Sequence, residues 1–186
     1  MTATTTCAPV MERAGAVTFK GNPLTLRGPA LTVGAKAPDF QTTGQDLAPV
    51  TLGRFTGTTL LISSVPSLDT PVCDAQTRRF NEAAATLPGV QILAVSMDLP
   101  FAQKRWCGAA GISQVTVVSD YKDASFGKAY GLLIKELRLL TRAIVVVDAA
   151  GTVRYVEVVP EVTAYPNYDA ALAAVRQVGG VPNSNA

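Results

Sequence analysis

The chain has 186 residues, of which 48% are hydrophobic and 16% charged, with a formal net charge of +2. A chain of this size buries one substantial core but hardly two, so we expect a single domain. The scattered Lys and Arg residues give no field strong enough to indicate nucleic acid or an anionic membrane as a partner. No apolar run approaches the roughly 18 residues of a transmembrane helix, and the N-terminus lacks the layout of a signal peptide, so we expect a cytoplasmic protein.

The inventory of reactive residues is short: the chain has no histidine and three cysteines, Cys7, Cys73 and Cys107. Hydrolases with a Cys-His pair and zinc sites that use histidine are therefore impossible, and three thiolates cannot complete an all-cysteine zinc site. We expect no metal and no bound cofactor. Three cysteines are also too few for a structural disulfide framework. Catalytic or redox-active thiols remain, beside inert buried ones.

The N-terminal part predicts an extension, a hairpin and a buried strand. Residues 1–15 are expected to be a flexible extension. Residues 17–26 hold two short alternating apolar runs around Gly21-Asn22, which is typical of a β-hairpin turn. After a short VTL stretch, residues 58–65 predict a central strand that runs directly into Pro66.

The segment after Pro66 predicts a helix with a cysteine in its first turn. Thr70 stands at a plausible N-cap and Pro71 at the first helical position. Cys73 then lies where unpaired backbone N–H groups and the positive end of the helix dipole favour an anion. A thiolate is stabilised there relative to a thiol, which suits a nucleophile. Apolar residues on one side of this helix are expected to face the core: Val72, Ala75, Phe80, Ala83, Ala84 and Leu87.

Strands and helices continue to alternate through the rest of the chain. A second buried strand is predicted at 91–97, and Pro100 begins a short helix that ends near Gly111 and carries Cys107 near its end. A strand follows at 115–120, a short helix at 125–131 and a strand-turn-strand unit at 142–159. A final helix begins near Asn167, and residues 181–186 are expected to be a frayed tail. The alternation indicates one α/β domain over 16–180 with a mixed central sheet.

Three segments together resemble one family of thiol enzymes. PSLDTPVC, at 66–73, fits the pattern Pro-x-x-x-Thr-x-x-Cys and resembles the peroxidatic motif of peroxiredoxins. SMDLPFAQKRWC, at 96–107, is similar to the resolving-cysteine segment of the bacterial thiol peroxidase subfamily, and TRAIVVVD, at 141–148, to its active-site arginine strand. The resemblance extends from about Val17 to Val178, including the N-terminal hairpin.

This resemblance implies a thioredoxin-like fold and a peroxidase that reduces hydrogen peroxide and organic hydroperoxides. Cys73 is the implied peroxidatic cysteine and Cys107 the resolving cysteine of the same chain, joined in turnover by an intramolecular disulfide. A homodimer and recycling by thioredoxin are also implied. Two features depart from the family: residues 132–141 form a shorter segment, and the extension with Cys7 has no counterpart.

Breaking an O–O bond requires a thiolate that attacks in line and donors that stabilise charge on the departing oxygen. The expected catalytic residues are therefore Cys73 as nucleophile, Arg142 as a permanent positive charge and Thr70 as a hydroxyl that can reach the sulfur or the peroxide. Thr70, Arg142 and Pro66 are expected to bind substrate, with Pro66 shaping the pocket. A disulfide needs Cα atoms within about 7 Å, so unwinding of the first turn around Cys73 is a further hypothesis.

Simpler interpretations of the same residues stay open. Either cysteine can be a small buried hydrophobe, and Arg142 a solvated charge at a strand start. Arg78 and Arg79, one turn after Cys73, fit a solvated helix face as well as a source of positive potential. The sequence also leaves two other functions open. One is a dithiol oxidoreductase or redox sensor, which the absence of a Cys-x-x-Cys motif disfavours, and the other is a binding module with unreactive thiols.

Overall fold

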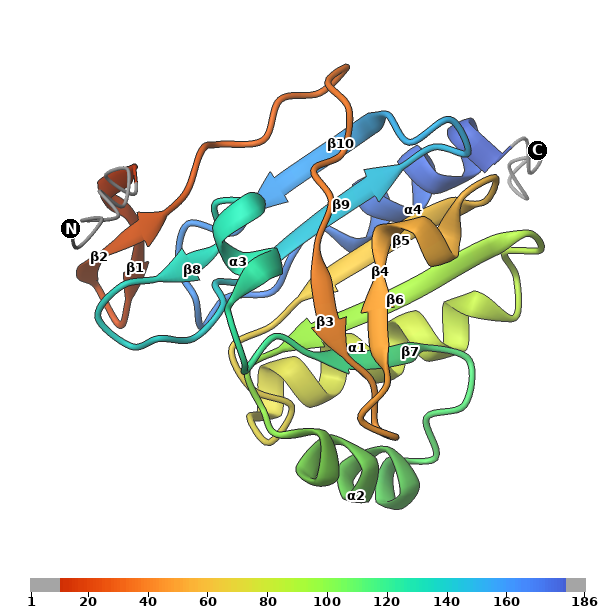
Figure 1. Ribbon diagram of the computed structural model, residues 1–186, viewed down its shortest axis with the longest axis horizontal. Coiled ribbons are helices and arrows are strands. Elements are labelled where there is room, and N and C mark those ends of the chain that lie inside the picture. Colours follow the sequence, from red (N-terminus) through yellow and green to blue (C-terminus); the bar gives the residue numbers. More distant parts are fainter. Residues whose placement is uncertain (1–10, 180–186) are drawn as a thin grey trace, which may run out of the picture.

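The computed structural model describes residues 11–179, which form a seven-stranded sheet, a three-stranded sheet and four α-helices (Figure 1). The strands are β1 Glu12–Phe19, β2 Asn22–Arg27, β3 Gln41–Thr43, β4 Pro49–Thr51, β5 Thr59–Ser64, β6 Val90–Ser96, β7 Thr116–Ser119, β8 Leu133–Ile134, β9 Ala143–Val147 and β10 Val153–Val158. The helices are the 3-10 helix η1 Leu52–Phe55 and the α-helices α1 Pro71–Ala84, α2 Pro100–Ala110, α3 Ser125–Ala129 and α4 Tyr168–Gly179.

The large sheet has the order β10-β9-β5-β6-β7-β3-β4 and is mixed, as predicted. Strand β5 is an interior strand of this sheet, parallel to β6 and antiparallel to β9, and all six of its residues are buried. The register pairs Ser64, at the end of β5, with Ala143, at the start of β9. The two segments that leave the sheet at this edge, one before α1 and one before β9, are therefore neighbours.

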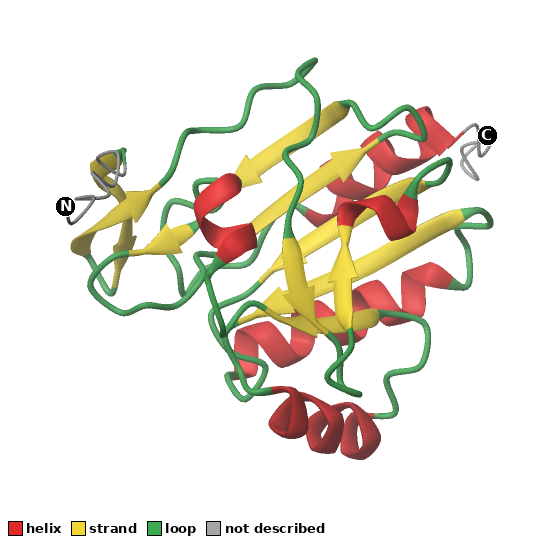
Figure 2. Ribbon diagram, viewed as in Figure 1, coloured by secondary structure: helices red, strands yellow, loops and turns green. Residues whose placement is uncertain are grey.

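Both faces of the large sheet are covered (Figure 2). Helices α1 and α4 lie on one face, where Leu61 of β5 packs in a core cluster with Cys73 and Phe80 of α1. Helix α3 and η1 lie on the other face, where Leu60 and Ile62 of β5 belong to a second core cluster. Side chains of a strand alternate between faces, so the apolar run of β5 supplies both clusters.

The N-terminal hairpin is present, but its turn lies one residue earlier than predicted. Phe19 pairs with Asn22, so Lys20 and Gly21 form the turn, both with positive φ (50° and 80°). Two positive φ values match the twist of the flanking strands, which is why two-residue hairpins favour them. Strand β1 also begins at Glu12, inside the predicted extension 1–15. Residues 1–10 of this extension, with Cys7, lie outside the described part, as does the predicted tail 181–186.

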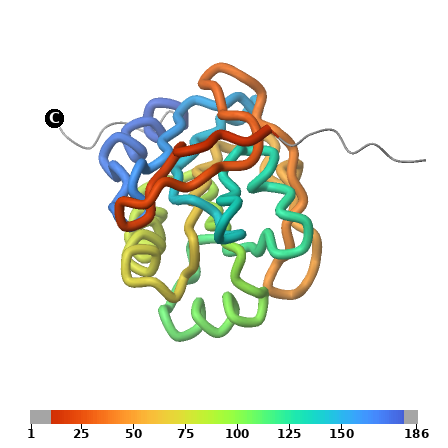
Figure 3. The backbone as a smooth tube through the Cα atoms, turned by 90° about the vertical axis from the view of Figure 1, so that its left-hand side faces the viewer, coloured from red at the N-terminus to blue at the C-terminus, as the bar shows by residue number. Residues whose placement is uncertain are grey.

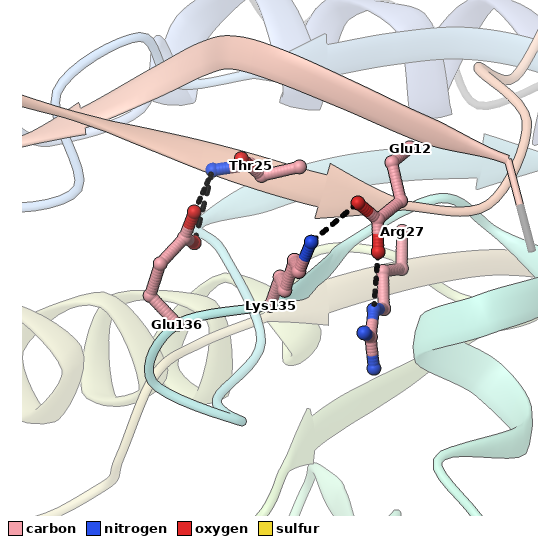
Figure 4. Close-up of polar contacts among 5 residues, drawn as sticks. All are labelled: Glu12, Thr25, Arg27, Lys135 and Glu136. Atoms are coloured by element: carbon pink, nitrogen blue, oxygen red, sulfur yellow. Dashed lines mark hydrogen bonds and ion pairs between the residues drawn. The ribbon is translucent and has the colours of Figure 1, made fainter.

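The segment 132–141 lies against this hairpin, which crosses the end of the molecule that faces the viewer in Figure 3. Strand β8, which the sequence did not predict, pairs with β2. Beyond β8, Lys135 contacts Glu12, and the Glu136 carboxylate accepts hydrogen bonds from the Thr25 backbone N–H at 3.0 and 3.1 Å (Figure 4). Glu12 also pairs with Arg27 at 3.2 Å, and Lys135 is the main reason that the pKa of Glu12 is lowered.

The helices begin and end close to the predicted residues, and the core face of α1 is confirmed in its second half, where Phe80 and, just beyond the helix end, Leu87 are buried. In the first turns the buried side chains are instead Cys73, Gln76 and Thr77, whereas Val72 and Ala75 are half-buried. The apolar pattern did not predict this part because two polar residues of the helix are in the interior. Helix α2 ends at Gly111 with φ of 68°, and the Asn167 side chain accepts a hydrogen bond from Ala170 N–H at the start of α4. In residues 11–179, no helix has the length and apolarity to cross a membrane.

Glu161 ties the hairpin to the loop after β10. Its carboxylate accepts hydrogen bonds from the backbone N–H groups of Lys20 and Gly21 and from the N–H and hydroxyl of Thr163. These bonds, the Thr163 hydroxyl first, lower the pKa of Glu161 to about 2. A carboxylate whose folded pKa is lowered contributes stability above its unfolded pKa and loses that contribution as the pH falls toward the folded value.

We therefore expect Glu161→Gln to lower the Tm at pH 7, because an amide nitrogen would face backbone N–H donors in either orientation. The Tm gap between variant and wild type should shrink as the pH falls from about 5 to about 2, where the wild-type carboxyl is itself protonated. Thermal melts across this pH range, with Glu82→Gln as an exposed control, measure the gap. A gap that does not depend on pH would contradict the assignment.

Candidate active site

Cys73 lies in the first turn of α1 and is fully buried. Thr70 is the N-cap residue and Pro71 follows at the first helical position, as predicted, but the Thr70 hydroxyl does not cap the helix. It lies 2.7 Å from Cys73 Sγ and 3.1 Å from the carbonyl oxygen of Ser67. The hydroxyl is thus held beside the sulfur, where it can donate a hydrogen bond to a thiolate.

Arg142 precedes β9 and reaches the same sulfur. Its side chain is buried, with the residue only 2% exposed, so the solvated alternative is wrong. The three guanidinium nitrogens bond to three different acceptors: Nε to the Val162 carbonyl at 3.1 Å, Nη1 to Gln76 Oε1 at 2.6 Å and Nη2 to Cys73 Sγ at 3.3 Å. The antiparallel pairing of β5 with β9 explains this meeting, because it places the start of β9 beside the segment that leads into α1.

The charge of Arg142 is compensated in an unusual way. Two of its three acceptors, the Val162 carbonyl and the Gln76 amide, are neutral, and none of its hydrogen bonds within residues 11–179 goes to a carboxylate. A buried guanidinium without an anion is costly, and it cannot lose its proton. Of the three acceptors, the sulfur of Cys73 is the one of a type that can carry a negative charge.

Gln76 and Ser63 complete the buried shell, and the sequence analysis missed both. Gln76 lies one turn after Cys73 on the core face of α1, and its Nε2 donates to the hydroxyl of Ser63 on β5 at 2.7 Å. This bond leaves Oε1 directed at Arg142. A polar residue one turn after the cysteine was the available signal, but the sequence analysis considered only the apolar residues of the helix.

Cys107 is near the end of α2, where it belongs to the same core cluster as Cys73 and is 7% exposed. Burial raises the pKa of the Cys107 thiol, and a hydrogen bond from Gln45 Nε2, 3.2 Å from Sγ, opposes this in part. Both cysteines are free thiols. Gln45 comes from the loop between β3 and β4, and no sequence pattern pointed to it.

The remaining candidates are Pro66, Arg78 and Arg79. Pro66 is buried two residues after the end of β5, in the loop that leads to α1. Arg78 and Arg79 have half-exposed side chains: Arg78 pairs with Asp74 at 2.8 Å, and Arg79 lies 4.2 Å from the ring centroid of Tyr168. Neither arginine has a hydrogen bond to the sulfur among the described contacts, which fits the solvated-face interpretation.

Comparison with known proteins shows which family the chain resembles in sequence and in fold. The Redoxin family model matches residues 32–172. A thiol peroxidase of Halalkalibacterium halodurans is 58% identical over 160 residues, which is 86% of this chain and 96% of that protein, and a thiol peroxidase of Bacillus subtilis is 51% identical over 160 residues with the same coverage. A peroxiredoxin-like protein of Aquifex aeolicus has a crystal structure that matches with a TM-score of 0.83 at 45% identity, covering 89% of this chain and 98% of that one.

The Arg142 contacts lead to a direct prediction. Arg142→Lys replaces three directed nitrogens with one ammonium, so the sulfur, the Gln76 amide and the Val162 carbonyl cannot all be satisfied. A lost charge-assisted hydrogen bond amounts to about 1.5–3 kcal/mol, so the alkylation rate of Cys73 by iodoacetamide should fall at least about tenfold. Peptide-resolved mass spectrometry separates Cys73 from the other thiols. An unchanged rate, or an equal fall in the exposed control Arg79→Lys, would show that Arg142 does not activate the sulfur.

Proposed function

Since this chain belongs to the Redoxin family and, within it, to the thiol peroxidases, we propose that it reduces hydrogen peroxide and organic hydroperoxides with Cys73 as nucleophile and Cys107 as resolving thiol. The protein is a thiol-dependent peroxidase with a thioredoxin-like fold. The observation that carries the assignment of Cys73 is its sulfur between the Thr70 hydroxyl and the buried Arg142 guanidinium.

In the first step the Cys73 thiolate attacks the terminal oxygen of the hydroperoxide. An S–O bond forms, the O–O bond breaks, and the electron pair leaves with the departing oxygen, which takes a proton from water to give water or an alcohol. Arg142 and the N–H groups at the start of α1 stabilise the charge that develops on that oxygen. Thr70 can donate to the sulfur before attack and to a peroxide oxygen during it. Pro66 limits access to the pocket.

In the second step Cys107 attacks the sulfenic acid on Cys73. The S–S bond forms, the S–O bond breaks, and the hydroxyl group leaves as water with the proton of the Cys107 thiol. The buried thiol with its raised pKa is a poor nucleophile where it lies, which supports a step in which the two helices first rearrange.

The third step returns the enzyme to the dithiol form. We assign it to thioredoxin, whose two thiols reduce the disulfide by exchange and become oxidised in turn. The resemblance to thiol peroxidases supports this reductant and also a homodimer. Gel filtration with light scattering tests the dimer independently of activity.

Two substitutions test the cysteine roles. Peroxide consumption driven by thioredoxin, its reductase and NADPH should disappear in Cys73→Ser, because no thiolate is left to attack. Cys107→Ser should also lose thioredoxin-driven turnover yet form a sulfenic acid that dimedone traps at Cys73. Full activity in Cys73→Ser would overturn the assignment of the nucleophile, and full thioredoxin-driven activity in Cys107→Ser that of the resolving thiol.

The raised pKa of Cys107 predicts how the second step depends on pH. A thiol with a raised pKa is protonated at neutral pH and becomes a thiolate only as the pH rises, so disulfide formation should quicken from pH 7 to pH 9. Gln45→Leu removes the bond that favours the thiolate and should move this rise to higher pH. Rapid quench with alkylation at each pH measures the step, and a rate that is flat over the range would contradict the prediction.

A further inference from the structure

Asp98, two residues after the end of β6, gathers hydrogen bonds from two parts of the chain. Its carboxylate accepts from the Ser67 hydroxyl at 2.7 Å, from the Leu68 backbone N–H at 2.8 Å and from the Ser96 hydroxyl at 2.8 Å. Ser67 and Leu68 belong to the loop between β5 and α1, whereas Ser96 ends β6. One half-buried carboxylate therefore fastens the loop in front of the nucleophile to the central sheet.

This fastening continues to the sulfur of Cys73. The carbonyl oxygen of Ser67 accepts from the Thr70 backbone N–H at 3.2 Å and lies 3.1 Å from the Thr70 hydroxyl. That hydroxyl in turn lies 2.7 Å from Cys73 Sγ. The position of the Thr70 hydroxyl thus depends on Ser67, and the position of Ser67 depends on Asp98.

The same cluster also holds the helix that carries Cys107. Gln103, on the core face of α2, donates from Nε2 to the Ser96 hydroxyl at 2.9 Å and to the Val118 carbonyl at 2.9 Å. The Ser96 hydroxyl in turn donates a hydrogen bond to the Asp98 carboxylate. Ser96 and Asp98 therefore join the segments of both cysteines, in addition to the bond from Arg78 of α1 to the Ala110 carbonyl of α2 at 2.8 Å. A small hollow lies between the loop before α1 and helix α2, and it is lined by Leu68, Asp69, Asp98, Ala102, Gln103 and Trp106.

We propose that Asp98 is a positioning residue: its carboxylate holds the loop before α1 and, through Ser96, the start of α2 in the arrangement that reduces peroxide. Its release is the event that allows Cys107 to reach Cys73. The proposal rests on the proposed function, because it assumes that the two cysteines form a disulfide in turnover.

The two chemical steps then place opposite demands on Asp98. Attack on peroxide needs Thr70 and the first turn of α1 in place, which the three bonds to Asp98 favour. Disulfide formation needs the loop and α2 to move, which the same bonds oppose. A variant that lacks the carboxylate should be slower in the first step and faster in the second. A substitution that merely destabilises another part of the protein is not expected to slow the first step and quicken the second.

The full-length protein allows both steps to be followed, because its single tryptophan, Trp106, adjoins Cys107 and lines the hollow beside Asp98. In stopped-flow fluorescence with hydrogen peroxide, the first step depends on peroxide concentration and the second does not. For Asp98→Ala we expect the second-order constant to fall about tenfold and the first-order constant to rise at least about threefold, since bonds to a carboxylate are lost. In Asp98→Asn, whose amide oxygen can still accept a hydrogen bond from Leu68 N–H, both rate constants should lie between those of Asp98→Ala and the wild type.

Two control variants separate this role from others. Asp69→Ala removes a neighbouring carboxylate whose side chain has no hydrogen bond among the described contacts, and Asp148→Ala removes one that holds the turn between β9 and β10 at the far end of the sheet. Both should leave the two constants close to wild type. If Asp98→Ala does not fold, Ser67→Ala carries the test, with smaller changes in the same directions.

The faster second step has a chemical readout of its own. A sulfenic acid that waits for Cys107 can be attacked by a second peroxide and become a sulfinic acid. At high peroxide, Asp98→Ala should therefore accumulate less sulfinic acid at Cys73 per turnover, as measured by mass spectrometry.

An unchanged or slower disulfide step in the folded variant, or the same pair of changes in either control, would overturn the role of Asp98. If the wild type forms no disulfide between Cys73 and Cys107 after peroxide treatment, the proposed two-cysteine cycle is wrong. If the wild type forms this disulfide but the Asp98 variants leave both rate constants unchanged, only the positioning role of Asp98 is wrong.

Discussion

The buried Arg142 guanidinium is the constraint on which this site depends. It is almost closed to solvent, it cannot lose its proton, and two of its three acceptors are neutral. The sulfur of Cys73 is the acceptor that can carry a negative charge. Sulfur and guanidinium therefore lie in direct contact, and Gln76 binds the guanidinium without adding a negative charge. A carboxylate in the place of Gln76 would neutralise the guanidinium and weaken its interaction with the sulfur.

The fold brings these groups together through the neighbourhood of β5 and β9. Ser64 pairs with Ala143, so the end of one strand and the start of the other lie at the same edge of the sheet. The chain leaves β5 toward Cys73 and enters β9 from Arg142, 69 positions apart in sequence. Strand ends supply precise positions because the ladder on both sides fixes the backbone that precedes the loop. This is where the chemistry of the molecule is concentrated.

The second cysteine lies in a different setting. Cys107 is held as a buried thiol with the Gln45 amide at its sulfur, and burial raises its pKa. The cluster around Asp98 joins the segments that carry the two thiols. In the proposed cycle, the stability of the reduced form and the speed of disulfide formation would depend on the same hydrogen bonds.

The sequence by itself determined the order of the helices and of the longer strands, the helix start at Pro71, the cysteine in the first turn and the family, because these depend on local propensity and on motifs of a few residues. It placed the hairpin turn one residue late, did not predict the short strand β8, and did not predict the buried side chains in the first turns of α1, where tertiary packing overrode the apolar pattern. Only the tertiary structure decided that Arg142 is buried and which partners satisfy it: Gln76 and Ser63 around the arginine, and Gln45 at Cys107, are polar residues whose roles depend on what lies across the fold. Local patterns carry no information about such distant neighbours, whereas the energy of a buried charge depends entirely on them.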